Sequence, residues 1–275
     1  MCGIIGYSGP KEPLPILIGG LSRLEYRGYD SAGVAILDGK KLTIEKKEGK
    51  LQVLKDHLED KKIIGNIGIG HTRWATHGIP NNINAHPHSD NQKEFAIIHN
   101  GIIENYAEMK DDLLKENYIF ESDTDTEVVA VELGNQWTGR LLETVTNVAK
   151  KLDGTYALVV TSTKEPGTIV AGRMMSPLVL GVGEGETFLA SDSAAILEHT
   201  NKMIFLENGD FVEITNGKFK LFDINMNEIS REIQEIDWKV SEAEKSGYDH
   251  FMYKEILEQA EVIERCLLYT SPSPR

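Results

Sequence analysis

The sequence predicts a layered α+β domain in which two β-sheets are covered by helices. Three successive regions with different sequence patterns support this prediction. Residues 3–105 have the pattern of short strands with glycine turns, residues 106–152 that of helices, and residues 155–235 that of one strand after another. Strands, then helices, then strands are typical of layered domains, because each sheet has an apolar face that another element must cover. With 275 residues, the chain is long enough to bury such a core.

The first stretch is predicted to contain five strands and two helices, from apolar residues that alternate or recur three and four positions apart. Its clearest turn is Asp38-Gly39, because Asp-Gly favours the tight turn that joins two antiparallel strands. The strands are expected at Gly3–Ser8, Val34–Leu37, Leu42–Glu45, Ile67–Thr72 and Phe95–His99, and the helices at Leu14–Leu24 and Leu51–Leu58.

The second stretch is predicted to be helical and the third to consist of strands separated by glycine and proline turns. Ser122-Asp123-Thr124-Asp125 stands just before the second of these helices, where short polar side chains cap free backbone N–H groups. The helices are expected around Tyr106–Glu116, Thr126–Trp137 and Leu141–Leu152, and the strands at Tyr156–Thr161, Thr168–Ala171, Leu178–Val182, Thr187–Ala190, Met203–Leu206, Phe211–Thr215 and Lys218–Phe222.

The end of the chain differs from the rest. The sequence becomes helical again from Ser241, and Met252–Ile263 is the clearest helix there. Cys266–Arg275, in contrast, shows no cap, apolar period or core pattern. We expect this last segment not to be a natural C-terminus, and we assign it no part in the fold.

Composition disfavours several classes of function. The formal charge of −14 disfavours binding to nucleic acid or to anionic membranes, because both need a basic surface. No apolar run has the length of a transmembrane helix, and the N-terminus lacks the basic and apolar regions of a secretory signal. Cys2 and Cys266, the two cysteines, cannot form a disulfide framework, so the expected location is the reducing cytoplasm.

Cys2 is the first candidate for chemistry. Cysteine is small enough to permit removal of Met1, which would leave a thiol and an α-amine on one residue. An α-amine has a pKa of about 7.7–8.0, against about 10.4 for lysine, so it can act as a base near neutral pH. Cys2 would then supply both nucleophile and base. The alternative is an incidental cysteine at a frayed end, although the following Gly3-Ile4-Ile5-Gly6 is typical of a buried strand.

Three further polar segments are candidates for binding. Gly70–Gly78 (Gly-His-Thr-Arg-Trp-Ala-Thr-His-Gly) contains Arg73, which could bind a carboxylate through two parallel hydrogen bonds or serve only as a structural arginine. Asn100-Gly101 is predicted to end a strand, either as a turn or as an amide and a backbone N–H that form an oxyanion hole. Asp123–Glu127 is predicted to cap a helix, and an extra aspartate there could accept a ligand ammonium.

Histidines are concentrated in the middle of the chain, which raises the alternative of a metal site. Zinc sites usually combine His-x₃₋₅-His with a further protein ligand. The sequence has no His-Glu-x-x-His motif, and no second cysteine lies nearby. We therefore expect structural histidines, with no metal and no other cofactor. Five of the eight histidines are concerned: His71, His77, His86, His88 and His99.

Taken together and in order, these motifs resemble those of a known protein family. The chain resembles the N-terminal glutaminase domain of the glutamine–fructose-6-phosphate aminotransferase family, within the class II glutamine amidotransferases, over about residues 2–265. The block Leu24–Gly33 (Leu-Glu-Tyr-Arg-Gly-Tyr-Asp-Ser-Ala-Gly) is most similar to this family. The other matching segments are Met1–Gly6, His71–Gly78, Asn84–His88, His99–Asn105 and Thr124–Glu127.

The resemblance implies a four-layer αββα sandwich of the N-terminal-nucleophile hydrolase type. It also implies an enzyme that hydrolyses L-glutamine to glutamate and ammonia through a thioester on Cys2. The implied site has Asn100 and the Gly101 N–H as oxyanion hole. Of the remaining positions, Arg73 would bind the glutamine α-carboxylate, Asp125 its α-ammonium, Thr76 and His77 would line the pocket, and Trp74 would lie on a mobile loop that closes over it.

The resemblance further implies a domain plan. Residues 2–240 would form the glutaminase domain, residues 241–265 would begin a connector to sugar-isomerase domains, and residues 266–275 match nothing. Fructose 6-phosphate would be bound only by those further domains, so we expect this chain to hydrolyse glutamine without making glucosamine 6-phosphate. The full-length enzyme is expected to be a homodimer or larger.

Two alternatives stay open. The domain could serve another class II acceptor, phosphoribosyl pyrophosphate or aspartate, although the block Leu24–Gly33 argues against this. It could also be a metal-binding or purely structural module built on the histidines. Sequence beyond residue 265 would decide the first alternative, and metal analysis of the purified protein would decide the second.

Overall fold

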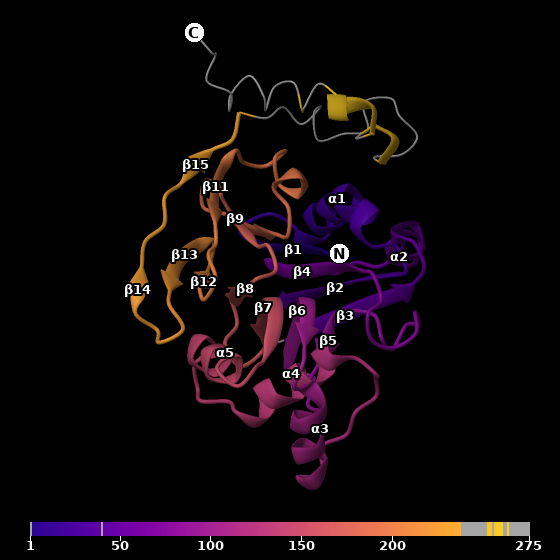
Figure 1. Cartoon of the computed structure of the whole chain (residues 1–275), viewed down its shortest axis with the longest axis vertical. Helices are drawn as coiled ribbons and strands as arrows, with labels where there is room; N and C mark the ends of the chain where they lie inside the picture. Colours follow the sequence, from indigo (N-terminus) through magenta and orange to yellow (C-terminus); the bar gives the residue numbers. More distant parts are fainter. Residues whose placement is uncertain (1, 40, 238–251, 255, 261–262, 264–275) are drawn as a thin grey trace. The chain divides into compact units, whose positions relative to one another are not determined.

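The computed structural model describes residues 2–39, 41–237, 252–254, 256–260 and 263 (Figure 1). The chain divides into two compact units, Met1–Ile236 and Asp237–Arg275. Residues 252–254, 256–260 and 263 of the second unit are helical, in agreement with the predicted helix Met252–Ile263. The rest of that helix, the start of the helical stretch at Ser241 and the segment Cys266–Arg275 lie outside the described residues.

Two antiparallel sheets form the centre of the first unit. In sheet A the strands lie in the order β15-β11-β9-β10-β1-β4-β2-β3, and in sheet B in the order β14-β13-β12-β8-β7-β6-β5. Sheet A contains β1 (Gly3–Ser8), β2 (Ser31–Asp38), β3 (Lys41–Glu48), β4 (Ile67–Arg73), β9 (Val179–Val182), β10 (Thr187–Ala190), β11 (Lys202–Phe205) and β15 (Gln234–Glu235). Sheet B contains β5 (His88–Ser89), β6 (Phe95–Ile103), β7 (Gly154–Ser162), β8 (Thr168–Met174), β12 (Phe211–Thr215), β13 (Lys218–Phe222) and β14 (Glu228–Ile229).

The two sheets pack face to face over one apolar core. Ile4 and Ile69 of sheet A belong to the same buried cluster as Ile98 and Val159 of sheet B. Burying an aliphatic side chain of this size contributes about 1.5–3 kcal/mol, so the inner faces hold the sandwich together. This packing also fixes which ends of the two sheets meet.

Helices cover the two outer faces. α1 (Pro13–Leu24) and α2 (Leu51–Leu58) pack on sheet A, whereas α4 (Asp125–Asn135) and α5 (Leu141–Ala149) pack on sheet B with α3 (Tyr106–Lys115) beside α4. Figure 1 shows these two helix groups on opposite sides of the paired sheets. The α+β prediction, with two sheets covered by helices, is therefore confirmed, and the layers follow the order α, β, β, α.

Every helix and strand expected between residues 3 and 222 is present, with ends displaced by a few residues. The main correction concerns β6, which was expected to end at His99 and continues to Ile103. Its pairing with β7 runs through Asn100 and Gly101, which face Ala157 and Tyr156. Backbone pairing needs no apolar side chain, so the polar residues that ended the apolar pattern do not end the strand. Asn100-Gly101 is therefore not a turn.

The two-residue strands β5, β14 and β15 were not predicted, because two residues are too few to show an alternation. Two short 3₁₀ turns were also missed: η1 (Glu25–Arg27) and η2 (Ser193–Ala195). Within the described residues, no helix has the length and apolar character needed to cross a membrane.

Candidate active site

A pocket of about 410 Å³ lies where the end of β4 meets the start of β1 and the second half of β6. Its lining includes all eight residues that the sequence singled out: Cys2, Arg73, Trp74, Thr76, His77, Asn100, Gly101 and Asp125. A wider cavity of about 770 Å³ elsewhere on the unit has none of these eight among its described lining residues. The structure thus brings the predicted site residues together in one place.

Strand register explains why Cys2 and Arg73 meet. β1 pairs with β4 so that Gly3 faces Thr72, and Cys2 therefore precedes β1 where Arg73 ends β4. The backbone N–H of Trp74 donates a hydrogen bond to Cys2 Sγ at 3.1 Å. Gly3 is needed here because a Cβ would overlap the side chains of Thr72 and Leu24. The thiol is consequently held against the backbone of the loop that follows β4.

Burial raises the pKa of the Cys2 thiol, and the hydrogen bond from Trp74 only partly opposes this. Burial disfavours the charged form of any acid, so the thiolate is not the resting state near neutral pH. A thiol in this setting needs a base to become a nucleophile. In the printed chain the nitrogen of Cys2 is joined to Met1 as a peptide, and a peptide nitrogen cannot act as that base.

Asn100 and Gly101 reach the pocket from sheet B. Asn100 Nδ2 donates a hydrogen bond to the carbonyl oxygen of Cys2 at 3.0 Å. Gly101 has a φ of +128°, and a Cβ there would overlap the carbonyl oxygen of Thr155. A side-chain amide and a glycine backbone therefore stand beside Cys2, which are the donor types of an oxyanion hole.

Arg73 is buried and only partly hydrogen-bonded. Its Nη2 donates to the carbonyl oxygens of His77 and Gly78, the second at 3.2 Å. Its Nη1 is buried and has no hydrogen-bond partner among the described residues. A buried unpaired guanidinium nitrogen is costly, which makes Arg73 a candidate for binding an anion.

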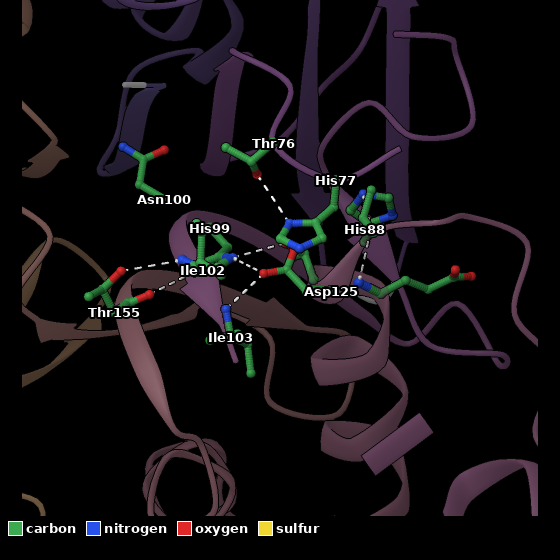
Figure 2. A network of polar contacts seen from close by, with 12 residues as sticks. Thr76, His77, His88, His99, Asn100, Ile102, Ile103, Asp125 and Thr155 are labelled. Atoms are coloured by element: carbon green, nitrogen blue, oxygen red, sulfur yellow. Dashed lines mark hydrogen bonds and ion pairs between the residues drawn. The ribbon is translucent and has the colours of Figure 1, made fainter. Parts of the chain in front are cut away.

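Asp125 is the first residue of α4, and Thr124 caps that helix by accepting from the Glu127 N–H at 3.3 Å. The buried Asp125 carboxylate accepts a hydrogen bond from the Ile103 N–H at 2.9 Å and lies 3.9 Å from His99 Nδ1. Figure 2 shows these three residues turned toward one another. The carboxylate therefore lies at the N-terminus of a helix, where the backbone favours a negative charge.

The loop after β4 supplies the remaining predicted residues. His77 Nδ1 and Thr76 Oγ1 are 3.4 Å apart, and the His77 ring packs edge-on against Tyr106. Figure 2 shows the contact between Thr76 and His77. Trp74 is half exposed, and its ring meets that of Tyr29 edge-on at 5.6 Å. The mobility predicted for this loop stays a prediction.

Four buried histidines lie at the pocket, and two of them, His86 and His99, line it. His71 stacks on His86 with centroids 4.2 Å apart, and His86 meets His88 edge-on at 4.7 Å. Burial lowers the pKa of His71, His86, His88 and His99, which favours neutral rings. Among the residues that the structure describes, no three His, Cys, Asp or Glu side chains are arranged to hold a metal ion.

Sequence reasoning assigned no role to several other lining residues. Arg27, His86 and His99 lay inside segments used for the family resemblance, so a signal existed for them. Arg27 Nη1 forms an ion pair with Asp192 at 2.9 Å. Ile102, Thr124 and Thr126 also lie inside those segments, whereas three further lining residues carry no sequence signal of their own: Thr155, Ser176 and Pro177.

Comparison with known proteins agrees with this geometry. Residues 55–246 match the family model described as "Glutamine amidotransferase domain". The chain belongs to this family. Members of this family are enzymes, so the prediction of an amidotransferase enzyme is confirmed, and the metal-binding alternative is not favoured.

Curated relatives show which kind of amidotransferase this chain is similar to. The chain is 48% identical over 272 residues to "Glutamine--fructose-6-phosphate aminotransferase [isomerizing]" of Fusobacterium nucleatum, covering 98% of this chain and 45% of the relative. It is 50% identical over 264 residues to the protein of the same name from Clostridium tetani, covering 96% of this chain and 43% of the relative. The predicted resemblance is confirmed, and the chain spans less than half the length of these relatives.

A solved structure shares the fold. Glutamine phosphoribosylpyrophosphate amidotransferase from B. subtilis, complexed with ADP and GMP, superposes with a TM-score of 0.72 and is 28% identical. The match covers 82% of this chain and 50% of that one. The predicted αββα sandwich of the N-terminal-nucleophile type is thereby confirmed for this glutamine amidotransferase domain.

Proposed function

We propose that this chain is the glutaminase part of a glutamine–fructose-6-phosphate aminotransferase and that it hydrolyses L-glutamine to glutamate and ammonia. The observation that carries the proposal is one pocket in which Cys2 lies with a buried cation, a buried carboxylate and an amide donor. Free glutamine carries an α-carboxylate, an α-ammonium and a side-chain amide. The three groups of the pocket match these three groups of the substrate in charge and polarity.

Arg73 and Asp125 would bind the two charges of glutamine. Arg73 Nη1 is a buried donor that has no hydrogen-bond partner among the described residues, and an α-carboxylate would satisfy it. Asp125 uses Oδ2 for the Ile103 N–H, which leaves acceptor capacity on the carboxylate for an α-ammonium. Opposite charges fixed in one pocket would select a free amino acid over a peptide-linked glutamine.

Cys2 would carry out the chemistry after Met1 is removed. Its α-amine takes the thiol proton, and Sγ attacks the side-chain carbonyl carbon of glutamine. The Asn100 amide and the Gly101 N–H hold the oxyanion that forms. Collapse breaks the C–N bond, the amine returns its proton to the departing ammonia, and a glutamyl thioester remains. Water then hydrolyses the thioester, so that glutamine and water give glutamate and ammonia.

The other residues of the loop after β4 would shape and cover the pocket. Thr76 and His77 line the pocket. Trp74 is half exposed, so it can move without removing a buried side chain from the apolar core. We propose that closure of this loop shields the thioester and retains ammonia. Shielding matters because ammonia that escapes to solvent is lost to an acceptor.

The acceptor itself lies beyond this chain. The names of the relatives support fructose 6-phosphate as acceptor, with residues 241–265 as the start of a connector to the domains that bind it. In this proposal the chain alone makes glutamate and ammonia but no glucosamine 6-phosphate. The full-length protein would be a homodimer or larger and would be cytoplasmic.

Glutamate release from L-glutamine tests the proposal, with the N-terminal mass of the protein determined beforehand. The protein without Met1 should release glutamate, and Cys2→Ala should abolish release while keeping the melting temperature. Protein that retains Met1 should be inactive, because the base is missing. Equal release by the wild type and Cys2→Ala would reject Cys2 as the nucleophile, and folded Met1-free protein without any release would reject the glutaminase function.

A further inference from the structure

His71 is a buried residue of β4 that the proposed chemistry does not use. Its ring nitrogen Nε2 lies 3.0 Å from Asn100 Oδ1 and 3.1 Å from the carbonyl oxygen of His99. The imidazole therefore bridges sheet A to the part of β6 that carries the amide donor. Sequence reasoning treated this residue only as a structural histidine or a metal ligand.

The two contacts determine which nitrogen of His71 carries the proton. A carbonyl oxygen can only accept, so Nε2 must donate to the His99 carbonyl. Burial lowers the pKa of His71 to about 3, so the ring is neutral at pH 7 and has a single N–H. That N–H is on Nε2. Nδ1 is the bare nitrogen, and it has no hydrogen-bond partner among the described residues.

This tautomer determines the orientation of the Asn100 amide. An Nε2–H can be satisfied by Oδ1 but is repelled by the NH₂ group, so Oδ1 must face His71. Nδ2 then faces Cys2, whose carbonyl oxygen accepts one of its two hydrogens at 3.0 Å. The second hydrogen is the one that an oxyanion at Cys2 would use. A flipped amide would instead present an oxygen to that negative charge.

The ring is itself held in place. It stacks on His86 with an interplanar angle of 29°, and β4 is paired on both sides, with His71 facing Ile4 of β1 and Gly33 of β2. A paired central strand and a stacked ring leave the imidazole little freedom to turn. The donor to Asn100 is thus preorganised, which an oxyanion hole requires.

We propose that His71 is a positioning residue that holds the Asn100 side-chain amide with its NH₂ toward the oxyanion. The proposal rests on the glutaminase function proposed above. It differs from a purely structural role, because the effect of His71 must pass through the side chain of Asn100.

A double-mutant cycle on glutamate release tests this path. His71→Leu should lower kcat about 5- to 100-fold, the range expected when a buried hydrogen-bond partner is lost, and should change KM little. In an Asn100→Ala background the same change should lower kcat by less than about twofold, because no amide remains to be held. Equal fold losses in both backgrounds would overturn the proposal, as would a rise in KM at constant kcat.

Two further variants keep the test decisive if His71→Leu does not fold. His71→Gln can place an amide N–H near the position of Nε2, whereas His71→Asn is one methylene too short. His71→Gln should therefore exceed His71→Asn in kcat by about fivefold or more at similar melting temperature. Equal kcat values would contradict the proposal. His199→Leu is the control, since His199 stacks on Phe188 and neither residue lines the pocket.

The tautomer gives a readout that does not depend on activity. Nitrogen NMR of the His71 ring should show a neutral Nε2–H form throughout the pH range from 5 to 8. An Nδ1–H form, or titration in that range, would overturn the proposal whether or not glutamine is hydrolysed. Absence of glutamate release from Met1-free protein, with the expected tautomer present, would instead reject the glutaminase function alone.

Discussion

The side-chain amide of Asn100 donates a hydrogen bond to the carbonyl oxygen of Cys2, at 3.0 Å and across 98 positions of the sequence. Asn100 belongs to sheet B and Cys2 precedes the first strand of sheet A. The bond therefore joins the two sheets at the point where the chemistry is proposed to occur. Both residues line the pocket, so the same bond also holds the Asn100 amide beside the proposed nucleophile Cys2.

Replacing Asn100 tests the oxyanion hole. Asn100→Ala should lower kcat for glutamine hydrolysis about 10²- to 10³-fold with KM nearly unchanged, because the lost donor acts in the transition state. Steady-state assays of glutamate release measure both constants. Asn105→Ala is the matched control, since Asn105 Nδ2 donates to the Lys151 carbonyl and does not line the pocket. A comparable fall of kcat in the control would contradict this account.

Replacing Arg73 tests recognition of the substrate carboxylate. Arg73→Gln should raise KM about 10- to 100-fold, the range for loss of a hydrogen bond to a charged group. The wild type should also discriminate strongly against the α-carboxamide of glutamine, which lacks the carboxylate. Arg73→Gln should lose most of that discrimination. If the variant still prefers glutamine as strongly as the wild type, Arg73 does not bind the carboxylate.

Replacing Gly101 tests the backbone requirement of β6. With φ at +128° and the Thr155 carbonyl in the way of a Cβ, Gly101→Ala should destabilise the protein by about 3 kcal/mol or more and reduce kcat. Gly209→Ala is the control, because φ there is +84° but no atom lies within 4 Å of the added Cβ. Its cost should stay near about 1–2 kcal/mol. Denaturant unfolding measures both, and equal costs would refute the steric argument.

Stability should fall in acid because of the buried histidines. Burial holds the pKa of His71, His86, His88 and His99 below the ordinary value of 6.5. Below about pH 6.5 the unfolded chain binds protons at these histidines and the folded chain does not. The contribution of the buried histidines to the free energy of unfolding is therefore complete above that pH and is lost as the pH falls. Each ring should add a slope of up to about 1.4 kcal/mol per pH unit.

Denaturant unfolding between pH 7.5 and 5 checks this slope. His88→Gln is the variant of choice, because His88 does not line the 410 Å³ pocket and the hydrogen bond of its Nε2 goes to the Thr124 hydroxyl, at 3.1 Å. It should lose stability at pH 7.5 but show a shallower fall in acid. A slope unchanged from the wild type would mean that His88 is protonated in the folded state.

The order of strands and helices could be predicted, because most elements are long enough to show an apolar period or a turn signal. The length of β6 could not, because the apolar pattern stops at His99 while the backbone pairing with β7 continues. That difference matters for function. It turns Asn100 and Gly101 from a candidate turn into strand residues that face the pocket.

The candidate site was predicted through the family resemblance more than through single residues. Cys2, Arg73 and Asp125 are far apart in the sequence, and only the register of β1 with β4 and the packing of α4 on β6 bring them together. Thr155 had no signal, because it reaches the pocket only through the pairing of β7 with β6. The role of His71 was missed because a histidine pattern does not show which acceptor its ring meets.

The central claim is that Cys2 forms a glutamyl thioester, and trapping this intermediate tests the claim most directly. Met1-free protein is given L-glutamine and hydroxylamine, and γ-glutamyl hydroxamate and glutamate are measured together. If Cys2 forms the thioester, hydroxamate should appear at the expense of glutamate, and Cys2→Ala should yield neither product. Glutamate release that persists in Cys2→Ala, with no hydroxamate formed, would contradict it.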